Sequence, residues 1–420
     1  MSSKNKTKPE LLAPAGNLKK AKTALAFGAD ALYAGVPSFS LRSRINEFDV
    51  RRLERIIRYA HAMDRKVYVT VNIFAHNRHL SKVAEHIKKI RESGADGVIV
   101  SDPGVLDIVK KNWPKANIHL STQANCTNWQ AARFWYRQGV KRIISARETT
   151  LEEVKEIRNK VPEVELEYFV HGAMCMAYSG RCFLSEYFRG RSANLGDCAH
   201  PCRWRYDLVE KTSGGSLEIE EDGSGSFFLN SKDLCLIKHL KELKEAGIRS
   251  FKIEGRTKSV YYVATVVGAY RRAIDILFDK KIKIKDKNKE TDFLYKELEN
   301  KLVNRGYSTG FLLGNKGKQN IKVAADKSDR QFCGEVLKSV RAAGGGYKVK
   351  IRVHNSIKAD DKVEILRPPY DITAVKVDKI WNAETGEEMR EAHGGGSGHT
   401  VEIIVPVHVP RFSVLRKKTK

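Results

Sequence analysis

The sequence lacks the signatures of several common protein classes. No apolar run approaches the roughly twenty residues that a membrane-spanning helix needs, and the N-terminus, MSSKNKTKPE, has no apolar export segment. Neither the HExxH motif of zinc peptidases nor the GxSxG motif of serine hydrolases occurs. We therefore expect a cytoplasmic protein without a membrane contact, and a standard metallopeptidase or serine-hydrolase mechanism has no support.

Negative charge is also scarce. Fifty Asp and Glu residues face 76 Lys and Arg residues, which gives a formal net charge of +26. Such a surplus favours a polyanionic partner such as RNA, because basic side chains that neutralise phosphates release counterions. General solubility is the alternative explanation, and charge alone does not decide between the two.

Apolar residues are plentiful enough for packed cores, at 41% of the 420 residues, and the length predicts two domains. From Glu10 onward, strand patterns alternate with helical ones, which is typical of parallel βα units. The eight expected strands are Leu11–Ala13, Ala31–Val36, Lys66–Ile73, Gly97–Ser101, Asn117–Ala124, Arg142–Arg147, Leu166–Val170 and Ser250–Glu254. The expected helices are 50–63, 80–93, 128–138, 151–160, 233–246 and 260–278. This pattern predicts a (β/α)8 TIM-like barrel over residues 9–325.

Other segments of the chain lie outside this alternation. Residues 1–8 are expected to be a disordered basic tail, and residues of about 172–230 to be a cysteine-rich insertion that contains a hairpin of 205–210 and 226–230. The charged stretch 280–290 is expected to be a solvated linker, followed by a short helix over 293–303. Residues 326–420 show short alternating runs and predict a small C-terminal β-barrel, in which the basic end 416–420 suits RNA binding or merely a stabilising module.

Four of the seven cysteines, Cys175, Cys182, Cys198 and Cys202, lie within 28 residues, separated by six, fifteen and three residues. Disulfides rarely persist in a reducing cytosol. A structural zinc site usually has two short CxxC-like pairs, whereas here only the last two cysteines lie close together, so zinc is disfavoured but stays open. Iron-sulfur clusters accept more varied spacing. We therefore expect a 4Fe-4S cluster in this loop, which follows the seventh strand on the face where barrels keep their active sites.

The same stretch, EYFVHGAMCMAYSGRCFLS from Glu167 to Ser185, resembles the signature of the collagenase-like peptidase family of unknown catalytic type. Further motifs resemble the branch of that family that makes 5-hydroxyuridine at the tRNA wobble position: PELLAPAG (9–16), SLRSRINEF (40–48), HLSTQAN (119–125), NSKDL (230–234), KIEGRTK (252–258) and CAHPCRW (198–204). The resemblance implies an oxygen-independent hydroxylase, with prephenate as co-substrate and hydroxyl source and the anticodon loop of tRNA as partner. It does not give the oligomeric state.

Some candidate site residues follow from strand parity, because alternate side chains share one face of a strand. In this way Tyr68, Thr70 and Asn72 share a face, as do His119, Ser121, Gln123 and Asn125, and likewise Lys252 and Glu254. Polar residues of this kind predict a solvent-filled, functional site at the end of the barrel. The alternative for Thr70 and Ser121 is that they form hydrogen bonds inside the barrel. The alternative for Lys252 and Glu254 is a structural ion pair.

His171 ends the seventh strand and is a candidate to contact substrate or to tune the cluster. With Lys252 and Glu254 it forms the expected catalytic set. A small dicarboxylate also needs guanidinium groups, which bind carboxylates at two points. The candidates are Arg42, Arg44, Arg147, Arg181 and Arg256, and the sequence does not divide them between the dicarboxylate and RNA.

Cys126, Cys235 and Cys333 are expected to be small buried residues. Cys235 needs care, because some relatives use a later cysteine as the fourth ligand, but we prefer Cys202, which shares a loop with Cys198. Aromatic residues around the cysteines are expected either to stack on a base or to pack around the cluster: Tyr178, Phe183, Tyr187, Phe188 and Trp204. The rival functions are hydroxylation of ribosomal RNA or of a quinone, peptidase activity, and an RNA-binding iron-sulfur sensor.

Overall fold

The structure is a computed structural model that describes residues 8–37, 39–41, 48–206, 229–314, 318–321, 323, 325, 327–394 and 399–419. Eight parallel strands form a closed ring, in which each strand pairs with the next along the chain and β7 pairs with β9. The strands are β1 (Glu10–Ala15), β2 (Ala31–Gly35), β3 (Lys66–Val71), β4 (Gly97–Val100), β5 (Ile118–Leu120), β6 (Arg142–Ile144), β7 (Glu165–Gly172) and β9 (Ile248–Ile253). The predicted TIM-like barrel is confirmed, with all eight strands near their expected positions.

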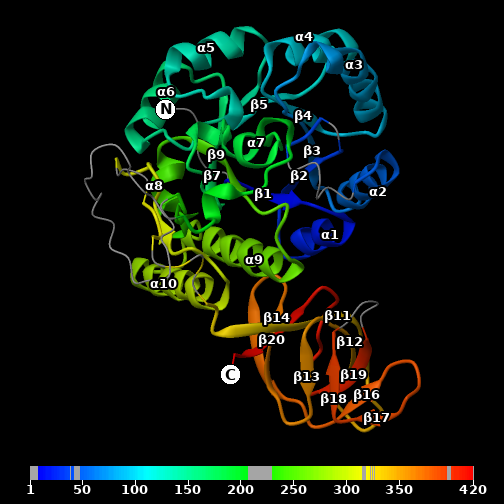
Figure 1. The fold of residues 1–420 in the computed structure, drawn as a ribbon. Coiled ribbons are helices and arrows are strands. Elements are labelled where there is room, and N and C mark those ends of the chain that lie inside the picture. Colours follow the sequence, from blue (N-terminus) through cyan, green and yellow to red (C-terminus); the bar gives the residue numbers. More distant parts are fainter. Residues whose placement is uncertain are drawn as a thin grey trace, which may run out of the picture. The chain divides into compact units, whose positions relative to one another are not determined.

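Helices alternate with these strands (Figure 1). Their apolar residues recur every three or four positions, so that one stripe is buried, as at Leu53, Ile56, Ile57 and Ala60 of α2. Side chains of Asp49, Asp102 and Thr150 cap the N-termini of α2, α4 and α6. The helices are α1 (Leu18–Ala26), α2 (Val50–His61), α3 (Asn77–Glu92), α4 (Pro103–Asn112), α5 (Trp129–Arg137), α6 (Leu151–Lys160), α8 (Leu240–Glu245), α9 (Val260–Leu277) and α10 (Ile284–Lys301).

Three local predictions are wrong. The fifth strand ends at Leu120, and Thr122–Ala124 form a 3-10 helix followed by Asn125 in the left-handed region, so Gln123 and Asn125 do not continue a strand face. Residues 233–235, expected to begin a helix, form β8 (Asp233–Cys235), because they pair with the end of β7 and with β10 (Tyr307–Ser308). Most of the expected linker 280–290 belongs to α10, whose buried Leu294 and Leu298 continue a helical stripe. The predicted hairpin 205–210 and 226–230 lies almost entirely outside the described residues.

A network of charged side chains lies inside the barrel. The guanidinium of Arg142 lies 2.6 Å from Glu10 and 3.2 Å from Glu167, and the other oxygen of Glu167 lies 2.7 Å from the Lys252 amine. The ion-pair partner of Lys252 is therefore Glu167, and not Glu254 as the alternation in the eighth strand suggested. Alternating signs compensate the buried charges, which would otherwise be costly to remove from water.

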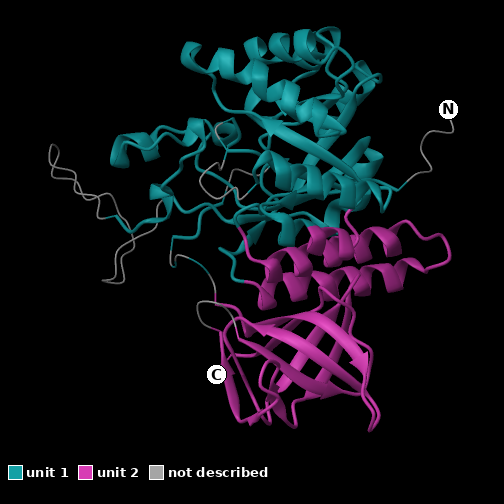
Figure 2. Ribbon diagram, turned by 90° about the vertical axis from the view of Figure 1, so that its right-hand side faces the viewer, with its two compact units in different colours: residues 1–21, 30–257, 303–326 teal, residues 22–29, 258–302, 327–420 magenta. Residues whose placement is uncertain are grey.

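The chain divides into two compact units, coloured separately in Figure 2. The first contains residues 1–21, 30–257 and 303–326, and so includes the whole strand ring; the second contains residues 22–29, 258–302 and 327–420. The second unit therefore combines α9 and α10 with the C-terminal strands.

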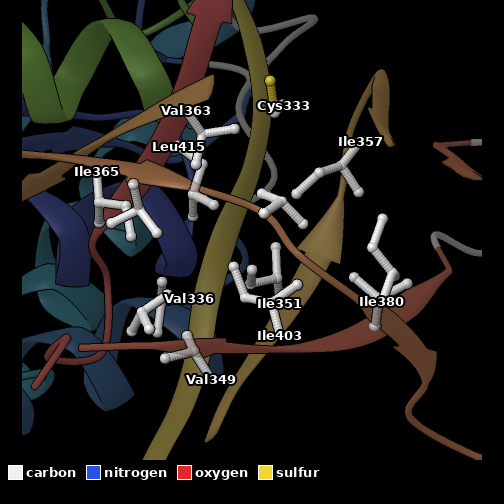
Figure 3. Close-up of a cluster of buried hydrophobic side chains, with 14 of the residues drawn as sticks. Cys333, Val336, Val349, Ile351, Ile357, Val363, Ile365, Ile380, Ile403 and Leu415 are labelled. Carbon is white, nitrogen blue, oxygen red and sulfur yellow. The ribbon is translucent and has the colours of Figure 1, made fainter. Parts of the chain in front are cut away.

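The C-terminal strands form an antiparallel sheet of eight, in the order β15-β14-β20-β11-β12-β19-β16-β17, and β13 (Ser356–Lys358) pairs separately with β18 (Glu391–His393). Alternate residues point into one apolar core, which includes Val336, Val349, Ile351, Ile365 and Ile403 (Figure 3). The sheet strands are β11 (Arg330–Arg341), β12 (Tyr347–Val353), β14 (Lys362–Arg367), β15 (Asp371–Lys376), β16 (Ile380–Asn382), β17 (Glu388–Met389), β19 (Thr400–Val405) and β20 (Val414–Lys418).

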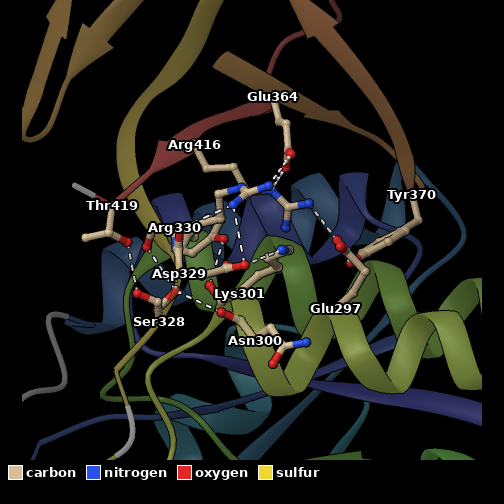
Figure 4. Close-up of polar contacts among 11 residues, drawn as sticks. Glu297, Asn300, Lys301, Ser328, Asp329, Arg330, Glu364, Tyr370, Arg416 and Thr419 are labelled. Atoms are coloured by element: carbon tan, nitrogen blue, oxygen red, sulfur yellow. Dashed lines mark hydrogen bonds and ion pairs between the residues drawn. The ribbon is translucent and has the colours of Figure 1, made fainter. Parts of the chain in front are cut away.

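The basic end of the chain is partly an interior feature of the second unit. Arg416 is fully buried, and its guanidinium donates to Glu297 of α10 at 2.6 Å and to Glu364 of β14 at 2.7 Å (Figure 4). Tyr370 also donates to Glu297, at 3.2 Å. Because Arg416 is occupied in this way, it is not a surface contact for RNA.

Among the described residues, no helix has the length and apolar character needed to cross a membrane.

Candidate four-cysteine site

One cavity at the carboxyl ends of the barrel strands brings the four clustered cysteines together. Cys175, Cys182, Cys198 and Cys202 all line it. The same cavity is lined by Met174, Met176 and Phe169, so apolar and thiol side chains share its walls. The remaining walls come from strand ends of the barrel and from the short helix α7 (Leu184–Arg189). The cysteine loop thus covers the end of the barrel where enzymes with this fold keep their active sites.

Short-range contacts fix the path of the cysteine loop. Gly172 ends β7 at φ +118°, and a Cβ there would lie 2.7 Å from Glu254, so only glycine allows the loop to leave the strand this closely. The carboxylate of Glu148 accepts bonds from the backbone N–H and the hydroxyl of Ser179 at 2.6 and 2.5 Å. The Asn194 amide exchanges two bonds with the backbone of Cys182, each 3.3 Å long. These bonds fix the path of the loop in place of the regular hydrogen bonds of a helix or sheet.

The four thiols influence one another electrostatically. Burial raises the pKa of Cys182, and Cys175 and Cys198 raise it further; burial and then Cys175 raise the pKa of Cys202. Thiolates this close repel each other, and a bound cationic centre offsets that repulsion, since metal binding deprotonates its cysteine ligands. The backbone N–H of His200 points at the Cys198 sulfur, 3.4 Å away. Backbone donors of this kind tune iron-sulfur clusters.

The donor set therefore fits the expected cluster. All seven cysteines are free of disulfides. Within the described ranges, no three or more His, Cys, Asp or Glu side chains are arranged to hold a single metal ion. A cubane cluster takes four cysteine thiolates, and four cysteines line this cavity.

Two arginines add positive charge beside the cysteines. Arg203 lines the cavity, and its Nε atom is buried without a hydrogen-bond partner. Burial lowers the pKa of Arg203, and the nearby Arg305 lowers it further. Arg305 donates to Asp233 at 2.6 Å and to the carbonyl of Met174 at 3.2 Å, which anchors the residue next to Cys175. Sequence reasoning did not single out either arginine, since their positions relative to the cysteines depend on the fold.

Amide and hydroxyl groups form another part of the cavity wall. The amide nitrogen of Asn72 lies 3.3 Å from the Ser121 hydroxyl and 3.4 Å from the Gln123 oxygen, and all three residues line the cavity. Gln123 thus reaches the site from a 3-10 helix and not from the predicted strand. Asn125, expected beside it, does not line the cavity as the structure describes it, because its left-handed backbone (φ 53°) turns the chain away.

Lys252, Glu254 and Tyr33 form a third part of the wall. The Tyr33 hydroxyl lies 2.9 Å from the carbonyl of Ile253 and 3.1 Å from the Glu254 carboxylate. Burial, and then Glu254, raise the pKa of Tyr33 well above its ordinary value, so the phenol stays protonated. Burial lowers the pKa of Lys252, while its partner Glu167 acts in the opposite direction. Sequence analysis missed Tyr33, although its alternation with apolar neighbours in the second strand was a readable signal.

The arginines predicted to bind a dicarboxylate differ in whether their guanidinium groups already have hydrogen-bond partners. Arg256 lines the cavity, but it donates to Ser40 at 2.8 Å and to Thr70 at 3.2 Å, so it braces the segment after β2. Arg147 also lines the cavity, and its guanidinium stacks 4.1 Å from the centre of the Phe169 ring. Among the described residues, no carboxylate lies within ion-pair distance of Arg147. Arg181 donates to the carbonyl of Gln123, and Arg42 and Arg44 lie outside the described residues.

Two further candidates lie away from the cavity. His171 is buried at the end of β7, where its ring packs 5.3 Å from Tyr307, and it is not among the described residues that line the cavity. Cys235, the alternative fourth ligand, pairs with His171 through β8 and does not line the cavity either. Cys126, Cys235 and Cys333 are all buried, as expected.

Comparison with known proteins gives matches along nearly the whole chain. The model of "Peptidase family U32" matches residues 16–322, and that of the "Peptidase family U32 C-terminal domain" matches residues 328–416. "tRNA hydroxylation protein P" of Escherichia coli (strain K12) is 39% identical and covers 95% of this chain and 94% of its own. "tRNA hydroxylation protein P1" of Bacillus subtilis (strain 168) is 37% identical, with coverages of 94% and 91%. The E. coli "23S rRNA 5-hydroxycytidine C2501 synthase" is 32% identical over 73% of this chain and 46% of its own.

Proposed function

This chain belongs to peptidase family U32, and we propose that it is a tRNA hydroxylase that converts the wobble uridine of the anticodon to 5-hydroxyuridine without molecular oxygen. The observation that carries the proposal is a cavity lined by four cysteines, in a chain similar over more than nine-tenths of its length to proteins named for tRNA hydroxylation. The formal net charge of +26 supports an RNA substrate.

Cys175, Cys182, Cys198 and Cys202 would hold a 4Fe-4S cluster. Such a cluster would supply one-electron redox chemistry. Arg203 and Arg305 would lie beside it and offset the negative charge of four thiolates. Arg305 would also position Cys175, through its bond to the carbonyl of Met174.

Prephenate, the proposed hydroxyl source, carries two carboxylates. Arg147 and Arg203 suit them, because both guanidinium groups line the cavity and neither has an ion-pair partner in the described part of the chain. A planar guanidinium can donate two parallel bonds to one carboxylate. Lys252 contributes less, because Glu167 already balances its charge at 2.7 Å.

The uridine base would enter from the single-stranded anticodon loop, where unpaired bases can be turned out and read at their edges. Asn72 and Gln123 offer amide groups for such an edge. We propose that Glu254, the carboxylate in this part of the cavity wall, contacts the base at its C5 edge. Tyr33, which stays protonated, would hold one oxygen of Glu254 in place through its hydroxyl.

Hydroxylation of ribosomal RNA is the second candidate. It is favoured by the 32% identity to a 23S rRNA 5-hydroxycytidine synthase, a match that covers 73% of this chain. The amides of Asn72 and Gln123 can form hydrogen bonds with either uracil or cytosine. The fold of the RNA, and not the cavity alone, would therefore decide between tRNA and ribosomal RNA. The peptidase activity in the family name gains no support from a serine or zinc motif in this sequence.

The test is to purify the protein without oxygen, measure iron and sulfide, and incubate it with prephenate and either unmodified tRNA or ribosomal RNA before nucleoside mass spectrometry. We expect about four irons per chain and one added oxygen on tRNA uridine. Cys175→Ala should lose both, whereas Cys126→Ala, a change at a buried cysteine outside the cavity, should keep both. Zinc in place of iron would refute the cluster, and oxygen added only to ribosomal RNA would move the assignment to the second candidate.

A further inference from the structure

The short helix α7 carries aromatic side chains that face solvent. Phe183 is 74% exposed and Tyr187 is 82% exposed. The backbone N–H of Tyr187 bonds to the carbonyl of Phe183, so the two rings lie one helical turn apart on one side of the helix. A structural role would bury such rings. Their exposure favours stacking on a base over packing around the cysteines, the two roles expected from the sequence.

Further rings continue this surface. Phe188 lies 5.1 Å from Tyr187 and 6.2 Å from Trp204, measured between ring centres, and Tyr206 lies 5.8 Å from Phe188. The guanidinium of Arg189 stacks 5.0 Å from the Trp204 ring. The result is a series of aromatic faces interleaved with arginine, and not a continuous apolar patch.

The charge of this segment is positive. Residues 175–206 contain five arginines and two acidic residues, and one of the arginines, Arg191, is paired with Asp197 at 2.8 Å. Arg181, Arg189 and Arg205 are exposed. Exposed aromatic rings among arginines are the arrangement that binds single-stranded nucleic acid, because every base has a face that stacks and every nucleotide carries a phosphate.

The same helix is part of the cavity wall. Cys182, Leu184 and Ser185 line the cavity, and they flank Phe183 in sequence. A nucleotide whose base occupies the cavity therefore has its chain neighbours within reach of the exposed side of α7, which is drawn over the strand ring in Figure 1.

We propose that Phe183 and Tyr187 are a stacking platform for the unpaired nucleotides that flank the base in the cavity. This rests on the proposed function, in that an RNA loop delivers the base. The platform selects loops over helices, because the bases of a duplex are already stacked on each other and expose only their edges.

The experiment compares two labelled RNAs by fluorescence anisotropy: an anticodon stem-loop, and a fully paired duplex with the same number of phosphates. Tyr187→Ala and Phe183→Ala should each weaken binding of the stem-loop about tenfold, the effect of losing one stacked base, and leave binding of the duplex unchanged. Tyr187→Phe should bind as the wild type does, because it keeps the ring. Phe134→Ala is the matched control, since Phe134 is 53% exposed on α5.

Circular dichroism and iron content of each variant exclude misfolding, and nucleoside mass spectrometry of the same samples separates the two proposals. Loss of stem-loop binding in both alanine variants, with no oxygen added even by the wild type, would support the platform and refute the hydroxylase. Normal stem-loop binding and hydroxylation by both variants would overturn the platform. A change in sedimentation without a change in RNA binding would also overturn it, because the surface would then join two copies of the chain.

Discussion

Replacing Arg147 by Met tests whether the cavity holds an anion. Among the described residues, Arg147 contacts no carboxylate, and its guanidinium stacks on the Phe169 ring, 4.1 Å from the ring centre. The loss of this cation–π contact costs about 0.5–1 kcal/mol at a partly exposed site, and Met keeps much of the apolar volume. We therefore expect Arg147→Met to fold with nearly the stability of the wild type.

Its effect on co-substrate binding should be much larger. Hydrogen bonds to a charged group contribute about 1.5–3 kcal/mol, so the loss of this guanidinium should weaken prephenate binding by a factor of about 10 to 150. Arg147→Lys keeps the charge but not the two-point geometry, and should give a smaller loss. Calorimetric titration of prephenate measures the affinity directly, and the KM for prephenate should rise in parallel.

Arg142→Met is the contrasting variant. Arg142 is buried between Glu10 and Glu167, so its removal leaves carboxylates uncompensated and should cost about 3–5 kcal/mol of stability. The reasoning fails if Arg147→Met binds prephenate as the wild type does, or if it unfolds as readily as Arg142→Met.

Three other predictions address the cluster, the second unit and the pH dependence of stability. Cys202→Ala should lose bound iron and Cys235→Ala should keep it, as measured by iron analysis, because of these two cysteines Cys202 lines the cavity and Cys235 does not. The reverse result would make Cys235 the fourth ligand. Arg416→Met should lower the free energy of unfolding by about 3–5 kcal/mol in urea titrations, and adding Glu297→Gln should restore part of it, because Glu297 would otherwise stay buried and charged. Burial lowers the pKa of His86 to about 4. The imidazole therefore binds a proton at a higher pH in the unfolded chain than in the folded one. As a result, the free energy of unfolding falls as the pH drops from about 7 towards 4. His86→Leu should flatten that part of the pH profile, and an unchanged profile would contradict the assignment.

Local patterns in the sequence were sufficient for the barrel. Strands buried on both faces are short apolar runs between amphipathic helices, and this contrast can be read residue by residue. The residue pattern gave a wrong prediction where contacts with distant segments decide the local structure. Asp233–Cys235 resembles the start of a helix until β7 and β10 provide hydrogen-bonding edges. The strand before Gln123 ends at Leu120, and Gln123 lies in a 3-10 helix that Asn125 ends in the left-handed region.

The pattern of residues along the chain was enough to predict the barrel and the position of the four cysteines after its seventh strand, and the composition shows the surplus of positive charge. The tertiary structure decided which charged groups are already paired. Arg256 bonds to Ser40 and Lys252 to Glu167, residues 216 and 85 positions apart, whereas Arg147 faces the cavity without a carboxylate partner among the described residues. It also decided that Phe183 and Tyr187 face solvent. The reason is physical: periodicity depends on neighbours along the chain, but electrostatic compensation and exposure depend on which distant residues the closed ring of strands brings together.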